Sequence, residues 1–108
     1  MDLTQNLKAF LENGEDWERK GTSLGGVSIL KLPGTKTRQA SLAIEINPLN
    51  EKGVPMKKKG IIIMGSNELR AFREIFNNEK TDTLISAVEE IIPGRKKVMG
   101  KDEDVLQI

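Results

Sequence analysis

The stretch Ser-Leu-Ala-Ile-Glu-Ile-Asn, residues 41–47, decides the fold, because large apolar side chains occupy every second position along it. Successive side chains of a β-strand point to opposite faces of the sheet. The pattern predicts a half-buried antiparallel strand with Leu42, Ile44 and Ile46 on the core face. The alternate residues, Ala43 and Glu45 among them, are expected on the other, open face.

Further strands are predicted on both sides of this segment. Val27 to Leu32 is β-like, and Pro33-Gly34 ends it with strong turn chemistry. After a polar loop, Lys58 to Met64 forms the next strand. Asp16 to Lys20 is expected to be a short first strand or an extended lead-in. Together these segments predict an antiparallel sheet of three to four strands.

Helices are predicted before and after the strands. Residues 2–13 carry apolar side chains at helical spacing and should form a short N-terminal helix. A second helix should begin near Ser66 or Asn67 and break at Asn77-Asn78, and a third should run from about Thr81 to Ile92. Strands followed by helices indicate an α+β fold in which the antiparallel sheet packs on C-terminal helices.

The composition limits the kind of protein this can be. The chain has 108 residues, of which 37% are hydrophobic and 31% charged, as is typical of one globular domain. We expect a single α+β domain over residues 1–94 and a charged, mobile tail over residues 95–108. No apolar run approaches the ~20 residues of a membrane span, and no signal sequence is evident, so we expect a cytoplasmic, nucleoid-associated protein without a membrane partner.

The residue types present also limit the chemistry. The chain contains no cysteine and no histidine, which removes disulfides, thiolate nucleophiles and the usual zinc sites. Glu45 has no obvious acid–base partner, and the sequence has no phosphate-cradling glycine loop of known spacing. We therefore expect no enzymatic activity, no cofactor and no metal. Abundant lysine and glutamate are compatible with a thermophilic source.

Positive charge is concentrated in one segment. Residues 31–60 contain seven basic and two acidic residues, a net charge of +5, whereas the rest of the chain has a net charge of −4. Basic groups at both ends of an open sheet face could hold a phosphate backbone that runs across it. A lysine-rich edge that resists aggregation is the simpler alternative for the charge alone. The candidate phosphate-binding residues are Lys31, Lys36, Arg38, Lys57, Lys58 and Lys59.

Aromatic residues are scarce, which limits base stacking. The chain has one Trp, three Phe and no Tyr, and the phenylalanines are expected on buried helix faces. Trp17 is the one good candidate for stacking on a base, although a partly buried core or interface position is at least as strong an alternative. The scarcity of aromatics favours several subunits enclosing a strand over one sheet that stacks the bases.

Four runs of sequence resemble a known family: Val-Ser-Ile-Leu-Lys-Leu-Pro-Gly (27–34), Ala-Ile-Glu-Ile-Asn-Pro (43–48), Lys-Lys-Gly-Ile-Ile-Ile (58–63) and Glu-Leu-Arg-Ala-Phe (68–72). They resemble the ThermoDBP-related single-stranded DNA-binding proteins of hyperthermophilic archaea. The resemblance implies a sheet that grips a helix, assembly into dimers or tetramers, and sequence-tolerant binding of single-stranded DNA between subunits. The matching basic residues are Lys31, Lys58 and Lys59.

Two other functions remain open at this stage. The first is RNA binding, which the same basic surface would serve. The second is a protein-interaction module that docks through the broad apolar stripe of the last helix and through the tail. In the tail, the apolar residues Val105, Leu106 and Ile108 follow the acidic residues Asp102 to Asp104.

Overall fold

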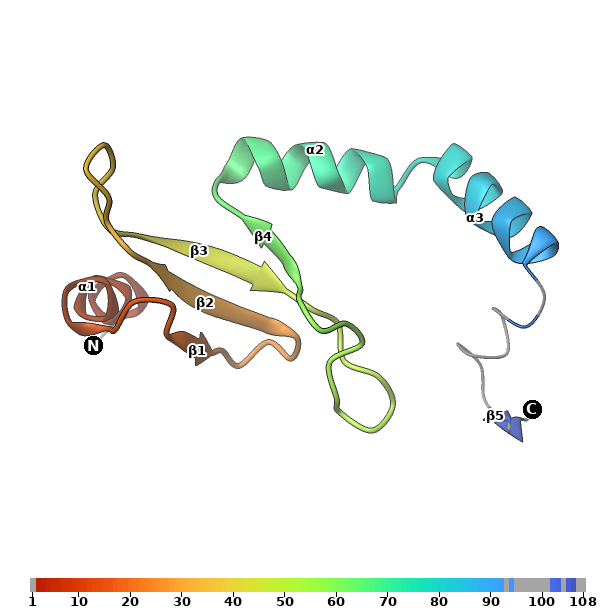
Figure 1. Ribbon diagram of the computed structural model, residues 1–108, viewed down its shortest axis with the longest axis horizontal. Coiled ribbons are helices and arrows are strands. Elements are labelled where there is room, and N and C mark those ends of the chain that lie inside the picture. The colour runs from red at the N-terminus through yellow and green to blue at the C-terminus, as the bar shows by residue number, and fades with distance from the viewer. Residues whose placement is uncertain (1, 93, 95–101, 104, 107–108) are drawn as a thin grey trace. The chain divides into compact units, whose positions relative to one another are not determined.

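The computed structural model describes residues 2–92, 94, 102, 103, 105 and 106. The chain divides into two compact units, Met1–Leu69 and Arg70–Ile108. The first unit contains a four-stranded antiparallel sheet whose strand order follows the sequence (Figure 1). Its strands are β1 (Arg19–Gly21), β2 (Val27–Leu32), β3 (Ser41–Ile46) and β4 (Ile61–Ile63).

The register of β2 and β3 defines the two faces of the sheet. Ser28 lies opposite Glu45, and Leu30 lies opposite Ala43. Directly opposed residues share a face, so these four side chains lie on one surface, which we call the Glu45 face. The intervening side chains lie on the other surface, the α1 face, and include Leu42, Ile44 and Ile46 as the alternation predicts.

The Glu45 face is not open along its whole length, which corrects the prediction. Ala43 is 2% exposed and Glu45 is 6% exposed. Ala43 forms a small buried apolar cluster with Leu30 and Leu32. A small side chain between two leucines allows close packing, so residues that alternate with the large apolar ones need not face water.

Helix α1 (Leu3–Asn13) packs against the α1 face of the sheet. Asp2 caps its first turn by accepting a hydrogen bond from the Gln5 amide, and the Gln5 side chain accepts one in return from the Asp2 amide. Phe10 is the buried residue of this helix, and the Lys20 ammonium of β1 lies 5.4 Å from the centre of its ring. A cation over an aromatic face is attracted to it, so this contact helps to join the helix to the edge strand.

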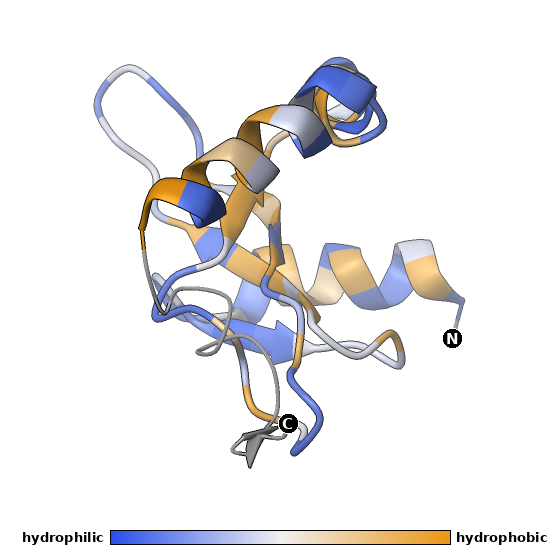
Figure 2. Ribbon diagram, turned by 90° about the vertical axis from the view of Figure 1, so that its right-hand side faces the viewer, coloured by the Kyte–Doolittle hydropathy of each residue, from blue (hydrophilic) through white to orange (hydrophobic). Residues whose placement is uncertain are grey.

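Two further helices follow the sheet: α2 (Ser66–Phe76) and α3 (Glu79–Ile91). Asn78 caps α3, with its side chain accepting a hydrogen bond from the Lys80 amide. Both helices carry hydrophobic and hydrophilic residues (Figure 2), and neither contains a buried residue. In α2, Phe72 and Phe76 stack with their ring centroids 6.1 Å apart. That these helices cover a face of the sheet stays a prediction.

The structure confirms the predicted α+β class, with a short N-terminal helix, a four-stranded antiparallel sheet and C-terminal helices. Near the C-terminus, the short strands β5 (Asp102–Glu103) and β6 (Val105–Leu106) pair antiparallel. Much of the predicted tail lies outside the described residues, so its separation from a domain over residues 1–94 stays a prediction. None of the described helices is long and apolar enough to cross a membrane.

Candidate nucleic-acid interface

The loop between β3 and β4 carries Lys57, Lys58 and Lys59, which we call the lysine triplet, and Asn47 holds the base of this loop. The Asn47 side-chain amide donates a hydrogen bond to the Lys57 carbonyl at 2.7 Å, and its oxygen accepts one from the Lys57 amide at 3.1 Å. The Met56 amide also donates to the Pro48 carbonyl at 2.8 Å. These bonds replace the regular ladder over residues 47–57 and fix where the triplet begins.

Glu45 holds the other end of the triplet. Its carboxylate accepts a hydrogen bond from the Gly60 amide at 3.0 Å and forms an ion pair with Arg19 Nε. The hydrogen bond from Gly60, followed by the one from Arg19, lowers the pKa of the Glu45 carboxyl below its usual value. A Cβ at position 60 would lie 2.5 Å from the Ile46 carbonyl oxygen, so this close approach requires glycine.

These contacts explain why β4 is shorter than predicted. The strand was expected from Lys58 to Met64, but it spans only Ile61–Ile63. Because the Gly60 amide donates to the Glu45 side chain instead of to a backbone carbonyl, the ladder begins at Ile61, the residue after Gly60, and not at Lys58. Lys58 and Lys59 therefore lie in the loop, where their side chains are exposed.

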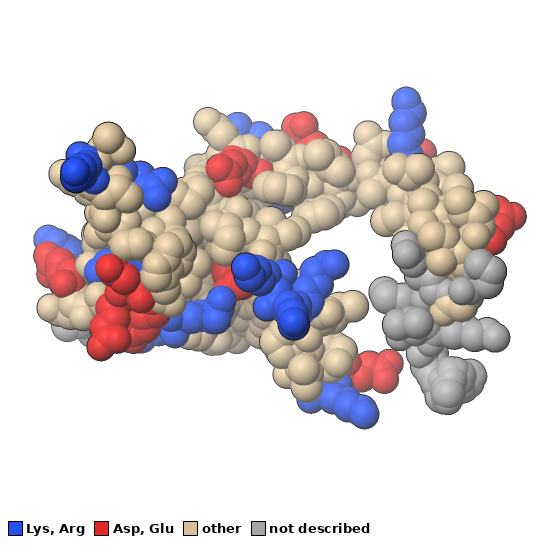
Figure 3. Space-filling view, in the orientation of Figure 1, with Lys and Arg blue, Asp and Glu red and all other residues tan. Residues whose placement is uncertain are grey.

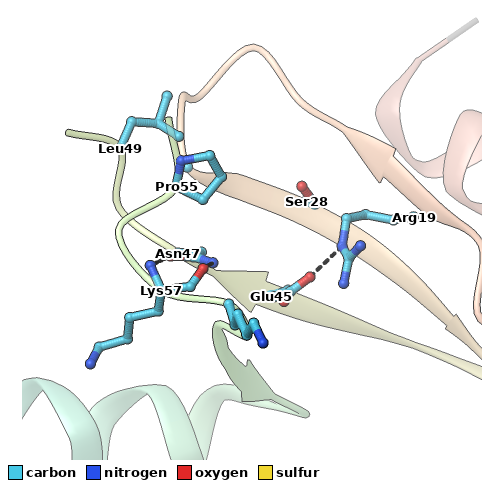
Figure 4. Close-up of a pocket in the computed structure, with 9 residues that line it drawn as sticks. Arg19, Ser28, Glu45, Asn47, Leu49, Pro55 and Lys57 are labelled. Atoms are coloured by element: carbon cyan, nitrogen blue, oxygen red, sulfur yellow. Dashed lines mark hydrogen bonds and ion pairs between the residues drawn. The ribbon is translucent and has the colours of Figure 1, made fainter. Parts of the chain in front are cut away.

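A hollow with a volume of about 250 Å³ lies beside Glu45 (Figure 4). Ser28 and Glu45 line it from the sheet, and Arg19 lines it from the edge strand. Figure 4 shows Leu49 and Pro55 together on the loop side of the hollow, while the side chain of Lys57 extends away from Glu45. The remaining lining residues are Gly26, Asn47, Lys57 and Lys58. We call this hollow the Glu45 pocket.

The predicted basic residues other than Lys31 lie at two opposite ends of the sheet. Lys36 and Arg38 are in the loop from β2 to β3, and residues 57–59 are in the loop from β3 to β4. Figure 3 shows Lys and Arg atoms gathered over both loops. All five side chains are exposed, and among the described residues none of them has a carboxylate partner. The six residues of β3 separate the two groups by about 20 Å, at ~3.4 Å per residue.

Lys31 does not belong to this surface, which corrects the prediction that it helps to bind phosphate. Lys31 is 6% exposed, and its ammonium donates hydrogen bonds to the carbonyls of Leu11 at 2.7 Å and Gly14 at 2.9 Å. These carbonyls lie at the C-terminal end of α1, where backbone acceptors lack helical partners and favour a cation. Lys31 lies on the α1 face and joins the helix to the sheet.

Trp17 is exposed, so the alternative of a core position is wrong. Trp17 is 63% exposed, and its φ of 66° is the only positive φ among the described residues other than glycine. The Trp17 amide donates to the Lys31 carbonyl at 2.8 Å, and the Lys31 amide donates to the Glu18 carbonyl at 2.9 Å. Two residues of one strand thus oppose one residue of β2, the arrangement of a β-bulge whose left-handed position is usually glycine.

The position of Trp17 has a consequence for binding. Because Arg19 lies opposite Leu30, Trp17 lies near the end of the sheet that carries Lys36 and Arg38. Its sequence neighbours Glu15, Asp16 and Glu18 are acidic and repel phosphate. The indole therefore offers an exposed apolar surface in an acidic stretch of the chain.

Arg19 is a candidate that the sequence reasoning missed. Its Nε is paired with Glu45, but among the described residues its two terminal nitrogens have no hydrogen-bond partner. A guanidinium held by a carboxylate on one edge can still bind a phosphate or stack on a base with the rest of its plane. The acidic residues around Trp17 obscured it, because they make the local sequence look unsuited to an anion.

A second, more open hollow of about 690 Å³ lies between α1 and the edge of the sheet formed by β1. Leu7, Phe10 and Ile29 line it together with Lys20.

Comparisons with protein-family models, with curated proteins and with solved structures find no match to this chain. The candidate interface consists of exposed cations that have no carboxylate partner among the described residues, one exposed indole, and a pocket lined by the Glu45 carboxylate.

Proposed function

We propose that this chain binds single-stranded DNA with little dependence on sequence and coats or protects exposed strands. The observation that carries the proposal is the set of five exposed cations at the two ends of one sheet, none with a carboxylate partner among the described residues. Single strands bind basic surfaces through phosphate contacts combined with stacking of their bases. The resemblance to the ThermoDBP-related proteins supports the same function.

The proposed binding mode combines two kinds of contact. Phosphates lie against Lys36 and Arg38 at one end of the sheet and against residues 57–59 at the other. Bases contact Trp17 and the Glu45 pocket, so a strand that spans both ends uses charged and apolar groups in turn. The sparse aromatic content is compensated by assembly, in which a second copy covers the strand from its other side.

Assembly is part of the proposal, and the C-terminal helices support it. Large apolar side chains are exposed on α3, including Leu84, Ile85 and Ile91. Exposed apolar surface of this kind on a helix marks a site of association. A homodimer or homotetramer would bury it and bring several basic surfaces together. Mass measurement in solution, with and without a DNA strand, tests this part, and a monomer in both conditions would contradict it.

The binding itself is tested by titrating fluorescently labelled oligo-dT at two salt concentrations. We expect affinity to fall as salt rises, with each neutralised phosphate contributing about −0.7 to the slope of log K against log salt. Changing residues 57–59 together to alanine should weaken binding and reduce the magnitude of that slope by about 2. A control variant changes Lys8 and Lys80 to alanine, which removes two exposed charges elsewhere and should alter the slope little.

The outcomes separate the possible functions. Absence of binding to oligo-dT at low salt would overturn the proposal, and binding that is indifferent to salt would overturn the phosphate mechanism. If the slope of log K against log salt were the same for the 57–59 variant and for wild type, the lysine triplet would be a solvated part of the loop that contacts no phosphate. Competition between oligo-dT and oligo-U of equal length tests RNA, because tighter binding of oligo-U would favour an RNA partner.

A further inference from the structure

The loop between β3 and β4 exposes apolar side chains as well as the lysine triplet. Val54 and Met56 are each 52% exposed, and Leu49 is also exposed. Leu49 is joined to Pro55 by an isolated β-bridge, so all three apolar side chains belong to one short hairpin. Exposed apolar groups that gather in one place among polar residues mark a site of interaction. We call Leu49, Val54 and Met56 the apolar loop residues.

Hydrogen bonds hold this hairpin in one shape. The Asn50 side-chain oxygen accepts hydrogen bonds from the amides of Lys52 at 2.8 Å and Val54 at 3.1 Å. The Asn50 amide donates to the Val54 carbonyl at 2.8 Å, and the Gly53 amide donates to the Asn50 carbonyl at 2.9 Å. Gly53 has a φ of 79°, which glycine adopts without strain. Because the loop is ordered with its apolar side chains outward, a ligand that covers them pays little to order the chain.

Cations lie on both sides of the apolar loop residues along the chain. Residues 47–60 contain four lysines and one glutamate, a net charge of +3. Lys52 precedes Val54, and Lys57 directly follows Met56. A nucleic-acid strand has a complementary order, since each of its bases lies between charged phosphates. The lysines attract the backbone, which brings the apolar side chains against the bases.

The apolar loop residues are of the types that separate stacked bases. Leucine, methionine and other apolar side chains can insert between neighbouring bases and partly unstack them. Unstacking has a cost, which is lowest where a base has the fewest neighbours. The last base pair of a duplex stacks on one side only, so a duplex end beside a single-stranded tail is the easiest place for such an insertion.

We infer that Leu49, Val54 and Met56 form a wedge that inserts between bases and opens the end of a duplex beside a bound single strand. The inference rests on the proposed function, because the lysine triplet that binds the single strand belongs to the same loop. An anionic lipid surface also attracts a loop of cations and apolar side chains. Nucleic acid is favoured because the loop is continuous with an interface that has further exposed cations, Lys36 and Arg38, at the opposite end of the sheet.

The test uses a duplex with a single-stranded dT tail and a 2-aminopurine in the base pair next to the tail. The fluorescence of 2-aminopurine rises when the base is unstacked, and a dye on the tail reports binding of the full chain by anisotropy. We expect wild type to raise the fluorescence. The double variant Val54→Ser with Met56→Ser should lose most of that rise when the tail is equally saturated.

Two further expectations distinguish the wedge from the phosphate contacts. The double variant should bind the tail about fivefold more weakly, at the lower end of the effect of removing a side chain that contacts a base. Its slope of log K against log salt should equal that of wild type, because the variant removes no cation. A control variant, Leu3→Ser, removes an exposed apolar side chain from α1 and should keep the whole rise in fluorescence.

The outcomes separate the wedge from strand binding. If the double variant and wild type gave an equal rise, or if wild type bound the tail without any rise, the wedge would be wrong and strand binding would stand. No binding of the tail at low salt would overturn both the wedge and the proposed function. Binding to phosphatidylserine vesicles that the double variant loses, without opening of the duplex by wild type, would assign the loop to a membrane surface and overturn the wedge.

A measurement on the wild-type chain alone decides the matter if the double variant does not fold. Met56 and Met64 are both exposed, so hydrogen peroxide should oxidise both in the free chain. Saturation with the tailed duplex should slow the oxidation of Met56, measured by mass spectrometry of the peptides. The oxidation of Met64 should not change, because Met64 follows β4 and lies outside the loop. Oxidation of Met56 at the same rate with and without DNA would overturn the wedge.

Discussion

Replacing Trp17 by glycine and by alanine separates the role of its side chain from that of its backbone. Both variants remove the same exposed indole, and they differ only in how well they tolerate the φ of 66° at this position. The hydrogen bond from the residue 17 amide to the Lys31 carbonyl is available to both. We predict that Trp17→Gly is the more stable variant and that both lose the same amount of binding affinity.

The magnitude follows from the left-handed conformation. A residue with a Cβ pays about 1–2 kcal/mol there, which glycine does not pay. Glycine loses about 0.5–1 kcal/mol more backbone entropy on folding than alanine. The difference predicts that Trp17→Gly exceeds Trp17→Ala in unfolding free energy by up to about 1.5 kcal/mol. At an ordinary strand position the order is reversed, with alanine the more stable, so the sign alone is informative.

Urea denaturation followed by circular dichroism gives the two unfolding free energies, and anisotropy of labelled oligo-dT gives the affinities. If the indole stacks on a base, both variants should bind more weakly by about 1–3 kcal/mol. An alanine variant as stable as the glycine variant, or more so, would show that Trp17 does not hold the left-handed conformation. Unchanged affinity in both variants would remove Trp17 from the interface and leave its exposure without a binding role.

Three further substitutions test the rest of the structure. Lys31→Met, which keeps the buried stem but not the ammonium, should lower the unfolding free energy by about 1–3 kcal/mol without changing the affinity for oligo-dT. Lys36→Met should instead weaken the binding of oligo-dT and leave the unfolding free energy unchanged. If Lys31→Met weakened binding without loss of stability, Lys31 would belong to the interface. Folding lowers the pKa of Glu45, so its contribution to the unfolding free energy is present above the unfolded-state pKa of 4.5 and is lost as the pH falls through the folded-state pKa. Urea denaturation of wild type and Glu45→Gln from neutral to acidic pH should therefore show a difference in unfolding free energy that shrinks below about pH 4.5. A difference that stays constant with pH would count against a lowered pKa. Gly60→Ala should destabilise the chain by about 1–3 kcal/mol, because the added Cβ clashes with the β3 backbone. Gly21→Ala should have almost no effect, since a Cβ added there meets nothing within 4 Å. Equal effects of the two variants in a thermal melt would refute the close approach of Gly60 to the Ile46 carbonyl.

The fold could largely be predicted from local sequence patterns. The bounds of β2 agree with the segment Val27 to Leu32, and those of β3 differ from the prediction by one residue. In both strands, turn residues follow directly on an apolar pattern. The prediction was less accurate for β4, because its start depends on the Gly60 amide donating to a side chain that is distant in sequence. Strand patterns alone carry no information on such a contact.

The candidate site was harder to predict, because charge in the sequence does not tell where an ammonium points. Lys31 contributed to the positive charge of its segment as much as Lys57 did, yet it lies on the α1 face and binds helix carbonyls. Arg19 was overlooked because its neighbours are acidic, although pairing across β2 brings it beside Glu45. Both errors have the same cause, since the side of the sheet on which a long side chain lies follows from register.

Register also links the two roles of Glu45. Its position opposite Ser28 on β3 brings the carboxylate within reach of both Arg19 and the Gly60 amide. It therefore fixes both the end of the loop that carries residues 57–59 and one wall of the Glu45 pocket. A ligand that competes for the carboxylate need not displace either contact, because each oxygen retains acceptor capacity. A buried acid in a surface proposed to bind an anion is then compatible with binding, because its charge is balanced locally by Arg19 while the exposed cations lie on the loops.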